Sequence, residues 1–190
     1  WLVGGGSAPI HAGHNWDRDL YALDTTHPAA MEWITEVFAT MHDWGFDFFK
    51  VDFVYAAAVP GSRHDDMSPL AAYRYGMEQL RRAMGDSYFL GCGAPIFPTV
   101  GLVDAMRISP DTEPQYLPRG GDLSQPSVIA AMMTGRGRAF QQGRFWINDP
   151  DNLTAIRNAA LHRTRGKILF VDATTPEPDQ DSGSVRLTNL

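Results

Sequence analysis

The sequence predicts an α/β fold on a parallel sheet, as an incomplete (β/α)₈ barrel. Apolar stretches of strand length alternate along the chain with stretches of helical, 3.6-residue periodicity. Eighteen glycines and thirteen prolines are spread between these stretches rather than clustered. Such alternation is typical of parallel sheets with crossover helices. A closed barrel needs eight strands, so the six found here predict about six β/α units with the N-terminal strands missing.

The six predicted strands are apolar stretches bounded by turn-forming residues. They cover residues 20–24, 46–53, 88–92, 103–109, 145–148 and 168–172.

Helices are predicted between these strands. The first begins near Pro28, after Thr25, Thr26 and His27, and ends at Gly45. Its predicted buried stripe is Met31, Ile34, Val37, Phe38, Met41 and Trp44. The second opens at Ser68-Pro69 and ends at Gly85, with the stripe Leu70, Tyr73, Met77, Leu80 and Met84.

The third and fourth helices are predicted from weaker patterns. One lies within residues 124–140, although two glycines weaken it, and the other covers 153–164. Residues 1–175 are therefore expected to form the incomplete catalytic barrel. Residues 176–190, rich in Pro, Asp and Ser, are expected to form a solvated tail.

Composition excludes several classes of partner. The chain is 44% apolar and 20% charged, which is ordinary for a globular domain. Its net charge of −6 argues against nucleic acid and anionic membranes as partners. We expect an interior segment of a cytoplasmic gene product, because residues 1–4 do not resemble a signal peptide. The single cysteine, Cys92, excludes an internal disulfide.

The predicted strand at 46–53 contains the first pair of candidate catalytic residues. Alternation places Lys50 and Asp52 on one face, with Phe49, Val51 and Phe53 on the other. In a barrel the charged pair would point inward at the carboxyl end, where active sites are built. An ammonium beside a carboxylate favours its ionised form, which suits a nucleophile. The alternative is a structural ion pair.

A second candidate element follows in residues 106–112. Arg107 and Ser109 share a face, and Pro110 ends the strand so that Asp111 stands at the rim. A glycosidase needs one ionised and one protonated carboxyl group, and Asp52 and Asp111 fit those two roles. Ser-Pro-Asp-Thr is also an ordinary turn sequence, which is the alternative.

Several ordered stretches give the sequence a family resemblance that covers about residues 15–151. It resembles glycoside hydrolase family 36, the bacterial α-galactosidases, also called melibiases. The stretches are Asn15-Trp16; Leu20-Tyr21-Ala22-Leu23-Asp24 with Thr26-His27-Pro28; Asp43-Trp44-Gly45-Phe46-Asp47 with Phe49-Lys50-Val51-Asp52-Phe53; Ala58-Val59-Pro60-Gly61; Leu90-Gly91-Cys92-Gly93; Asp104-Ala105-Met106-Arg107-Ile108 with Pro110-Asp111-Thr112; and Gly143-Arg144-Phe145-Trp146-Ile147-Asn148-Asp149-Pro150-Asp151.

The resemblance implies a retaining α-galactosidase that acts on terminal α-galactosyl groups of oligosaccharides. It implies Asp52 as nucleophile, Asp111 as acid/base, and substrate contacts by Lys50, Cys92 and Arg107. The implied partner is a small galactoside, and no metal or other cofactor is expected.

Two departures from the family follow. The family binds galactose with paired aspartates and tryptophans, and these residues are expected before residue 1. The match fades after Asp151, where Asn152 stands in place of an expected cysteine. The isolated chain is therefore expected to be inactive.

Other functions stay open. A retaining galactosyltransferase of the raffinose-synthase type or an inactive carbohydrate-binding fragment would share these residues. His11, His14 and Asp17 allow a metal site, although His-Ala-Gly-His in a Gly-rich loop is atypical of barrel metallohydrolases.

Several residues carry weaker hypotheses. Asp24 would either pair with Lys50 or have a structural role. Trp146 and Asn148 would either border the pocket or pack in the core. Tyr116 would stack on a sugar, whereas Trp33 and Trp44 would have packing roles only.

Overall fold

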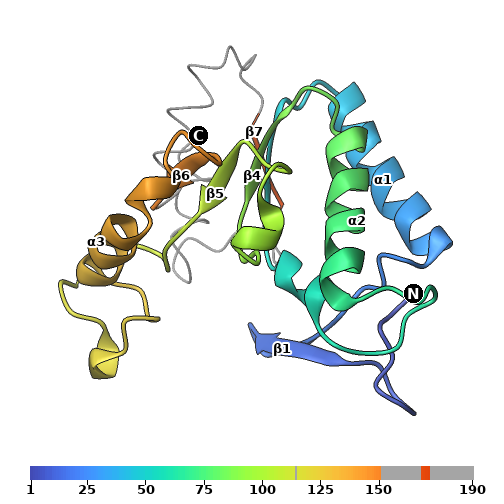
Figure 1. Ribbon diagram of the computed structural model, residues 1–190, viewed down its shortest axis with the longest axis horizontal. Helices are drawn as coiled ribbons and strands as arrows, with labels where there is room; N and C mark the ends of the chain where they lie inside the picture. Colours follow the sequence, from blue (N-terminus) through green and yellow to red (C-terminus); the bar gives the residue numbers. More distant parts are fainter. Residues whose placement is uncertain (114, 151–167, 172–190) are drawn as a thin grey trace.

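A five-stranded parallel sheet organises the chain. The computed structural model describes residues 1–113, 115–150 and 168–171 (Figure 1). The sheet has the order β6-β5-β4-β3-β7. Its strands are β3 (Phe48–Val51), β4 (Tyr88–Gly91), β5 (Ala105–Arg107), β6 (Ile147–Asp149) and β7 (Ile168–Val171). Every pairing between them is parallel. The α/β class and the parallel sheet are thus confirmed.

The predicted strand at 20–24 is wrong as a member of this sheet. Strand β2 (Arg18–Tyr21) pairs antiparallel with β1 (His11–Asn15) in a separate two-stranded sheet. The two strands are joined by Trp16 and Asp17 alone, which is the shortest common hairpin connection. A hairpin at the surface does not need continuous apolar sequence, so the polar stretch at 11–19 gave little strand signal.

The last predicted strand forms, but at an unexpected edge. In a (β/α)₈ barrel consecutive strands are neighbours, which would place β7 beside β6. It pairs instead with β3, with Phe49 opposite Leu169. Strands β3 to β6 do follow the barrel order, each beside the next. The predicted helix at 153–164 and the tail at 176–190 lie outside the described residues.

Among the described residues, three α-helices accompany the sheet: α1 (Pro28–Asp43), α2 (Pro69–Ala83) and α3 (Val128–Gly137). Helices α1 and α2 lie side by side along one side of the sheet, whereas α3 lies near β5 and β6 at the other end (Figure 1). Short 3₁₀ turns occupy the connections: η1 (Val54–Ala58), η2 (Phe97–Thr99), η3 (Arg119–Gly121) and η4 (Ala139–Gln141).

The start of α2 shows why the sequence forms a helix there. Pro69 occupies the first turn, where no N–H bond is lost, and Ser68 Oγ accepts from Ala71 N at 3.3 Å. Tyr73, Met77 and Leu80 are buried as predicted, but Leu70 is exposed. Trp44 of the α1 stripe is also exposed, because it lies just past the end of that helix.

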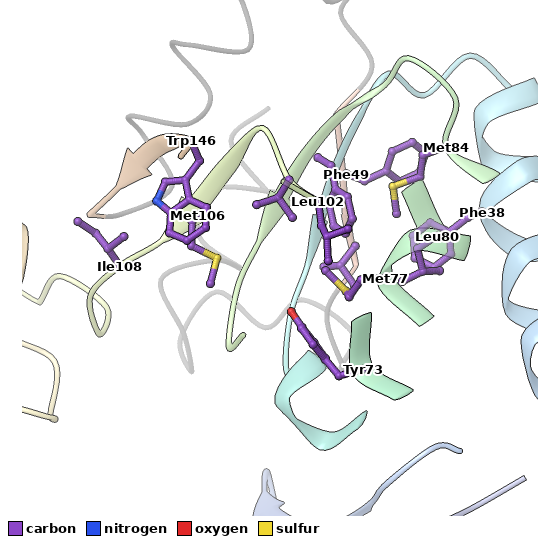
Figure 2. Close-up of a cluster of buried hydrophobic side chains, with 13 residues drawn as sticks. Phe38, Phe49, Tyr73, Met77, Leu80, Met84, Leu102, Met106, Ile108 and Trp146 are labelled. Carbon is purple, nitrogen blue, oxygen red and sulfur yellow. The ribbon is translucent and has the colours of Figure 1, made fainter. Parts of the chain in front are cut away.

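The core lies between the sheet and helices α1 and α2. Phe49 of β3, Met106 of β5 and Trp146, just before β6, join Phe38 of α1 and Met77 of α2 in one cluster (Figure 2). We call this side of the sheet the helix face. Phe49 is fully buried, a burial that contributes about 2–3 kcal/mol for a side chain of this size.

The opposite side carries a second, smaller cluster. Phe48, Tyr88, Leu90 and Ala105 are buried together there. We call this side the inner face. Residues alternate between the two faces, so Lys50 lies on the inner face between Phe49 and Val51 of the helix face. The strand alternation does not extend to Phe53, because β3 ends at Val51 and Phe53 is left-handed, with φ 56°.

Candidate active site

Four polar residues stand at one level where the strands end. Strand register pairs Val51 with Gly91 and Gly91 with Met106, so Asp52, Cys92 and Arg107 follow at the next step. Arg107 is in turn paired with Asp149 of β6. These positions belong to the inner face, two residues beyond the level of Lys50 and Leu90. The carboxyl ends of four neighbouring strands therefore present a continuous polar layer.

Asp52 is held from two sides. Lys50 Nζ lies 3.7 Å from Asp52 Oδ2, and the two side chains are only 13% and 19% exposed. The backbone N–H of Phe53 donates to Asp52 Oδ1 at 2.7 Å. An ammonium and an N–H donor thus orient the two carboxylate oxygens separately. This arrangement brings the predicted Lys50–Asp52 pair together.

The backbone next to Asp52 is strained. Phe53 has φ 56°, a conformation that bulky residues rarely adopt. The chain then turns into η1, and Tyr55 N donates to the Gly93 carbonyl at 2.8 Å. This bond ties the end of β3 to the segment that follows β4. Strain of this kind is commonly retained at functional sites.

Cys92 is a buried thiol within the polar layer and is 6% exposed. Burial raises its pKa, and the negative charge of Asp52 raises it further. The thiol also donates to the Asp52 carboxylate, while Lys50 and Arg107 act in the opposite direction. The thiol therefore stays protonated and is a weak nucleophile at neutral pH.

Arg107 and Asp111 form an ion pair across the end of β5. The guanidinium Nη2 donates to Asp111 Oδ1, with Arg107 only 4% exposed and Asp111 56% exposed at the side chain. A buried cation thus anchors a carboxylate that reaches into solvent. The structure brings the predicted residues Lys50, Asp52, Cys92 and Arg107 to one face, and ties Asp111 to them through Arg107.

The hairpin β1–β2 lies on the carboxyl-end side of the sheet (Figure 1). Tyr55 Oη of η1 donates to the Ala12 carbonyl at 3.0 Å. Trp16, in the hairpin turn, meets Phe53 edge to face with ring centroids 5.4 Å apart. Trp16 and Asp17 share with Phe53 the positive φ values found for non-glycine residues in the described chain. The hairpin therefore packs against the residue that follows Asp52.

A cavity of 290 Å³ lies on the other side of β3, between α1, α2 and η1. Its walls include Phe38, Tyr73 and Met77, and Asp52 is the acidic residue among those that line it. A polyhydroxylated ligand needs many hydrogen-bond partners, which these apolar walls do not offer. The inner face with its polar layer is the better candidate for a sugar site.

The weaker hypotheses are resolved as follows. Asp24 has the structural role, because its carboxylate accepts from Thr26 N and Thr26 Oγ1 and from His64 N. Trp146 belongs to the buried core, and its Nε1 donates to Asn148 Oδ1 at 3.0 Å, so this pair lies on the helix face. Tyr116 is exposed.

The two hairpin histidines, His11 and His14, lie beside Asp19 and not beside Asp17. His11 Nε2 and His14 Nδ1 lie 3.2 Å and 2.8 Å from Asp19 Oδ1, whereas the sequence suggested Asp17. Antiparallel pairing places His14 opposite Asp19. Within the described ranges, no group of three or more His, Cys, Asp or Glu is arranged to hold a metal ion. Helices there are also too short or too polar to cross a bilayer.

The sequence reasoning missed Asp149 and Gly93. Asp149 lies in one of the resembling stretches, but the sequence pattern predicts the pocket side of its strand at Trp146 and Asn148. Its signal is the alternation itself, since Asp149 follows Ile147 on the inner face. Gly93 belongs to the resembling stretch Leu90-Gly91-Cys92-Gly93, but its close approach to Asp52 and Phe53 does not follow from the local sequence.

Comparison with solved structures reveals a clear similarity. The chain is similar to an α-galactosidase. With TtGalA from Thermus thermophilus, solved with p-nitrophenyl α-D-galactopyranoside, it shares 35% identity over 79% of its length at a TM-score of 0.69. With the stachyose complex of TtGalA, the identity is 30% over 94% of its length at the same TM-score of 0.69. No protein-family model matches the sequence.

The chain spans less than half of these solved proteins. It covers 31% of the first and 42% of the second. The similarity supports an α-galactosidase-like fold.

Proposed function

We propose that the protein is a retaining α-galactosidase of the family 36 type, acting on terminal α-D-galactosyl groups. The observation that carries this proposal is the 35% identity to an α-galactosidase over 79% of the chain. The polar layer supports it, because a glycosidase of this kind needs two carboxyl groups with different surroundings. Asp52 is enclosed beside Lys50, whereas Asp111 is exposed beside Arg107.

In the first step, Asp52 is the nucleophile. One carboxylate oxygen attacks the anomeric carbon of galactose and forms a glycosyl ester. The bond from that carbon to the leaving oxygen breaks, and its electron pair stays on the oxygen, which takes a proton from Asp111. Lys50 and the Phe53 N–H orient the attacking carboxylate.

In the second step, Asp111 is the base. It removes a proton from water as the water oxygen attacks the same carbon, and the ester electrons return to Asp52. Two inversions give net retention. Arg107, held beside Asp111, has further N–H donors for a sugar hydroxyl. Cys92 provides a small, uncharged wall next to Asp52.

The isolated 190 residues are proposed to be inactive. Five parallel strands are too few to close a (β/α)₈ barrel, and β6 and β7 stand at the edges of the described sheet. Open sheet edges favour association over catalysis. A soluble monomer of residues 1–190 with galactosidase turnover would contradict this part of the proposal.

The complete gene product that includes these residues tests the activity. We expect it to hydrolyse p-nitrophenyl α-galactoside, and proton NMR of the first-formed sugar to show the α-anomer. An initial β-anomer would mean inversion and a wrong role for Asp52. Transfer of galactose to an added sugar acceptor in preference to water would instead identify a galactosyltransferase.

A further inference from the structure

Left-handed residues gather next to the proposed nucleophile. Trp16 and Asp17 form the turn of the β1–β2 hairpin, and Phe53 follows Asp52. In the part of the chain that the structure describes, these three are the non-glycine residues with positive φ. A side chain disfavours this conformation, because its Cβ crowds the following carbonyl oxygen. Such residues persist only where their surroundings hold them, so the contacts that hold Phe53 also bear on Asp52.

The conformation of Phe53 sets the direction of the N–H group that it offers to Asp52. That N–H donates to Asp52 Oδ1 at 2.7 Å. The chain is fixed on both sides of it, by β3 up to Val51 and by Tyr55 N, which donates to the Gly93 carbonyl at 2.8 Å. A change in φ at Phe53 would therefore tilt the peptide group between residues 52 and 53 and turn its N–H away from the carboxylate.

Aromatic contacts hold the Phe53 side chain in place. The Trp16 ring meets the Phe53 ring edge to face, with centroids 5.4 Å apart. The Tyr55 ring lies against the same ring, with 6.4 Å between centroids. Aromatic pairs at these distances attract each other beyond the area that they bury. Relaxation of Phe53 to a negative φ would swing its ring away from Trp16, so this contact opposes the relaxation.

Tyr55 fixes the hairpin that carries Trp16. Its Oη donates to the Ala12 carbonyl of β1 at 3.0 Å. The approach is close, because a Cβ atom on Gly13 would stand 2.8 Å from that oxygen. Tyr55 is thus bonded to the hairpin through its side chain and to the connection after β4 through its backbone.

We propose that Tyr55 and Trp16 are positioning residues that keep Phe53 left-handed and thereby aim its N–H at the Asp52 carboxylate. The hairpin belongs to a separate two-stranded sheet, yet through these two residues it orients the proposed nucleophile. This inference rests on the proposed function for the role of Asp52, but not for the contacts among the four residues.

The test compares two backgrounds of the complete gene product, the parent and Phe53→Gly. In the parent, Tyr55→Phe removes one hydroxyl and should lower kcat on p-nitrophenyl α-galactoside by roughly 10-fold with little change in KM. Glycine adopts positive φ without strain, so in Phe53→Gly the hairpin contacts are no longer needed. There, Tyr55→Phe should change kcat by less than about twofold. An equal factor in both backgrounds would overturn the inference.

Trp16→Leu tests the other positioning residue. It keeps an apolar side chain but removes the ring that contacts Phe53. If Tyr55 acts by holding the hairpin and Trp16 in place, the double variant with Tyr55→Phe is no slower than Trp16→Leu alone. Losses that multiply would overturn the inference, because residues that act independently do not couple.

Tyr73→Phe is the matched control. It also removes one tyrosine hydroxyl, which is bonded to Thr99 Oγ1 at 2.6 Å within the core of the helix face. It should lower the melting temperature and leave kcat within about twofold of the parent. A loss of kcat as large as that of Tyr55→Phe would overturn the inference, because any lost hydroxyl would then have the same effect.

Amide hydrogen exchange gives a readout that needs no substrate. Mass spectrometry of a peptide that covers residues 52–58 should show faster exchange in Tyr55→Phe and Trp16→Leu than in the parent, but not in Tyr73→Phe. Unchanged exchange in the first two variants would overturn the inference, even if Phe53→Gly does not fold. Faster exchange in both, together with a parent that lacks galactosidase activity, would support the inference and refute only the proposed function.

Discussion

Gly93 and Asp52 approach so closely that a Cβ atom on Gly93 would stand 2.6 Å from Asp52 Oδ1. The same Cβ would lie 2.8 Å from the Phe53 nitrogen, which donates to that carboxylate oxygen. Gly93 also has φ +50°, where L side chains are rare. The position of the proposed nucleophile therefore depends on the absence of a side chain on the neighbouring strand connection.

The first prediction is that Gly93→Ala displaces Asp52. The methyl group meets backbone as well as the carboxylate, so the end of β3 has to shift. A displacement of about 1 Å at a reacting group costs on the order of 100-fold in rate. We expect kcat on an aryl α-galactoside to fall by about that factor in the complete gene product, as measured by steady-state kinetics.

Gly101→Ala is the matched control for this variant. Gly101 is also left-handed, with φ +83°, but a Cβ there has no heavy atom within 4 Å. Both variants should lose roughly 1 kcal/mol of stability from the strained alanine. Only Gly93→Ala should lose activity. Equal activity losses in the two variants would show that strain, and not contact with Asp52, is responsible.

The second prediction concerns the reactivity of Cys92. The thiolate is the reactive form, and burial together with the charge of Asp52 raises the pKa of this thiol. A thiol-specific aromatic disulfide reagent at pH 8 should therefore label Cys92 slowly in the native protein and rapidly in denaturant. Labelling of the native protein as fast as that of the unfolded chain would contradict a buried position beside Asp52.

The third prediction concerns stability at acidic pH. Burial alone raises the pKa of Asp24, but hydrogen bonds from Thr26 and His64 outweigh it, so that the net pKa is lowered from 3.8. A carboxyl with a depressed folded-state pKa stabilises the fold above its unfolded pKa. That contribution is lost as the pH falls through the lower, folded value.

Asp24→Asn should therefore lower the melting temperature at pH 7, because its amide faces two N–H donors with one oxygen. The deficit should shrink as the pH is lowered from 4 toward 2, where the parent carboxyl becomes protonated too. Asp66→Asn, at an exposed carboxylate, serves as the control. A deficit for Asp24→Asn that is independent of pH would contradict the assigned role.

The sequence predicted the sheet well where strands are buried on both sides. Phe48, Phe49 and Val51 give β3 a continuous apolar signal, and alternation placed Lys50 on the inner face. The hairpin β1–β2 was not predicted, because polar residues such as His11, His14 and Asp19 interrupt any alternation of apolar side chains there. The left-handed conformation of Phe53, with φ 56°, does not follow from a pattern with period two.

The candidate site was predicted only where it depends on local sequence. Lys50 and Asp52 are neighbours on one strand, and Arg107 and Asp111 are four residues apart. Asp149 is the register partner of Arg107, and Gly93 lies against Asp52, so both positions depend on how neighbouring strands pair and end. Register is set by how whole elements pack, so one sequence without its fold does not determine it.

The last prediction separates the roles of the two proposed catalytic carboxyl groups. In the complete gene product, Asp52→Gly and Asp111→Gly should both lose most activity, so rates alone do not distinguish nucleophile from acid/base. Azide does, because it is small enough to occupy the space that either carboxylate leaves. The measurement is the anomeric configuration of the galactosyl azide formed from an activated aryl α-galactoside.

The two variants should yield opposite anomers. If Asp52 is the nucleophile, azide replaces it in Asp52→Gly and attacks from the same side in a single displacement, giving the β-galactosyl azide. If Asp111 is the acid/base, Asp111→Gly still forms the glycosyl ester, because an activated aryl group leaves without a proton. Azide then opens that ester in a second inversion and gives the α-galactosyl azide. Swapped products would show that the two residues are assigned backwards, and a β-product from both would mean that no ester forms on Asp52.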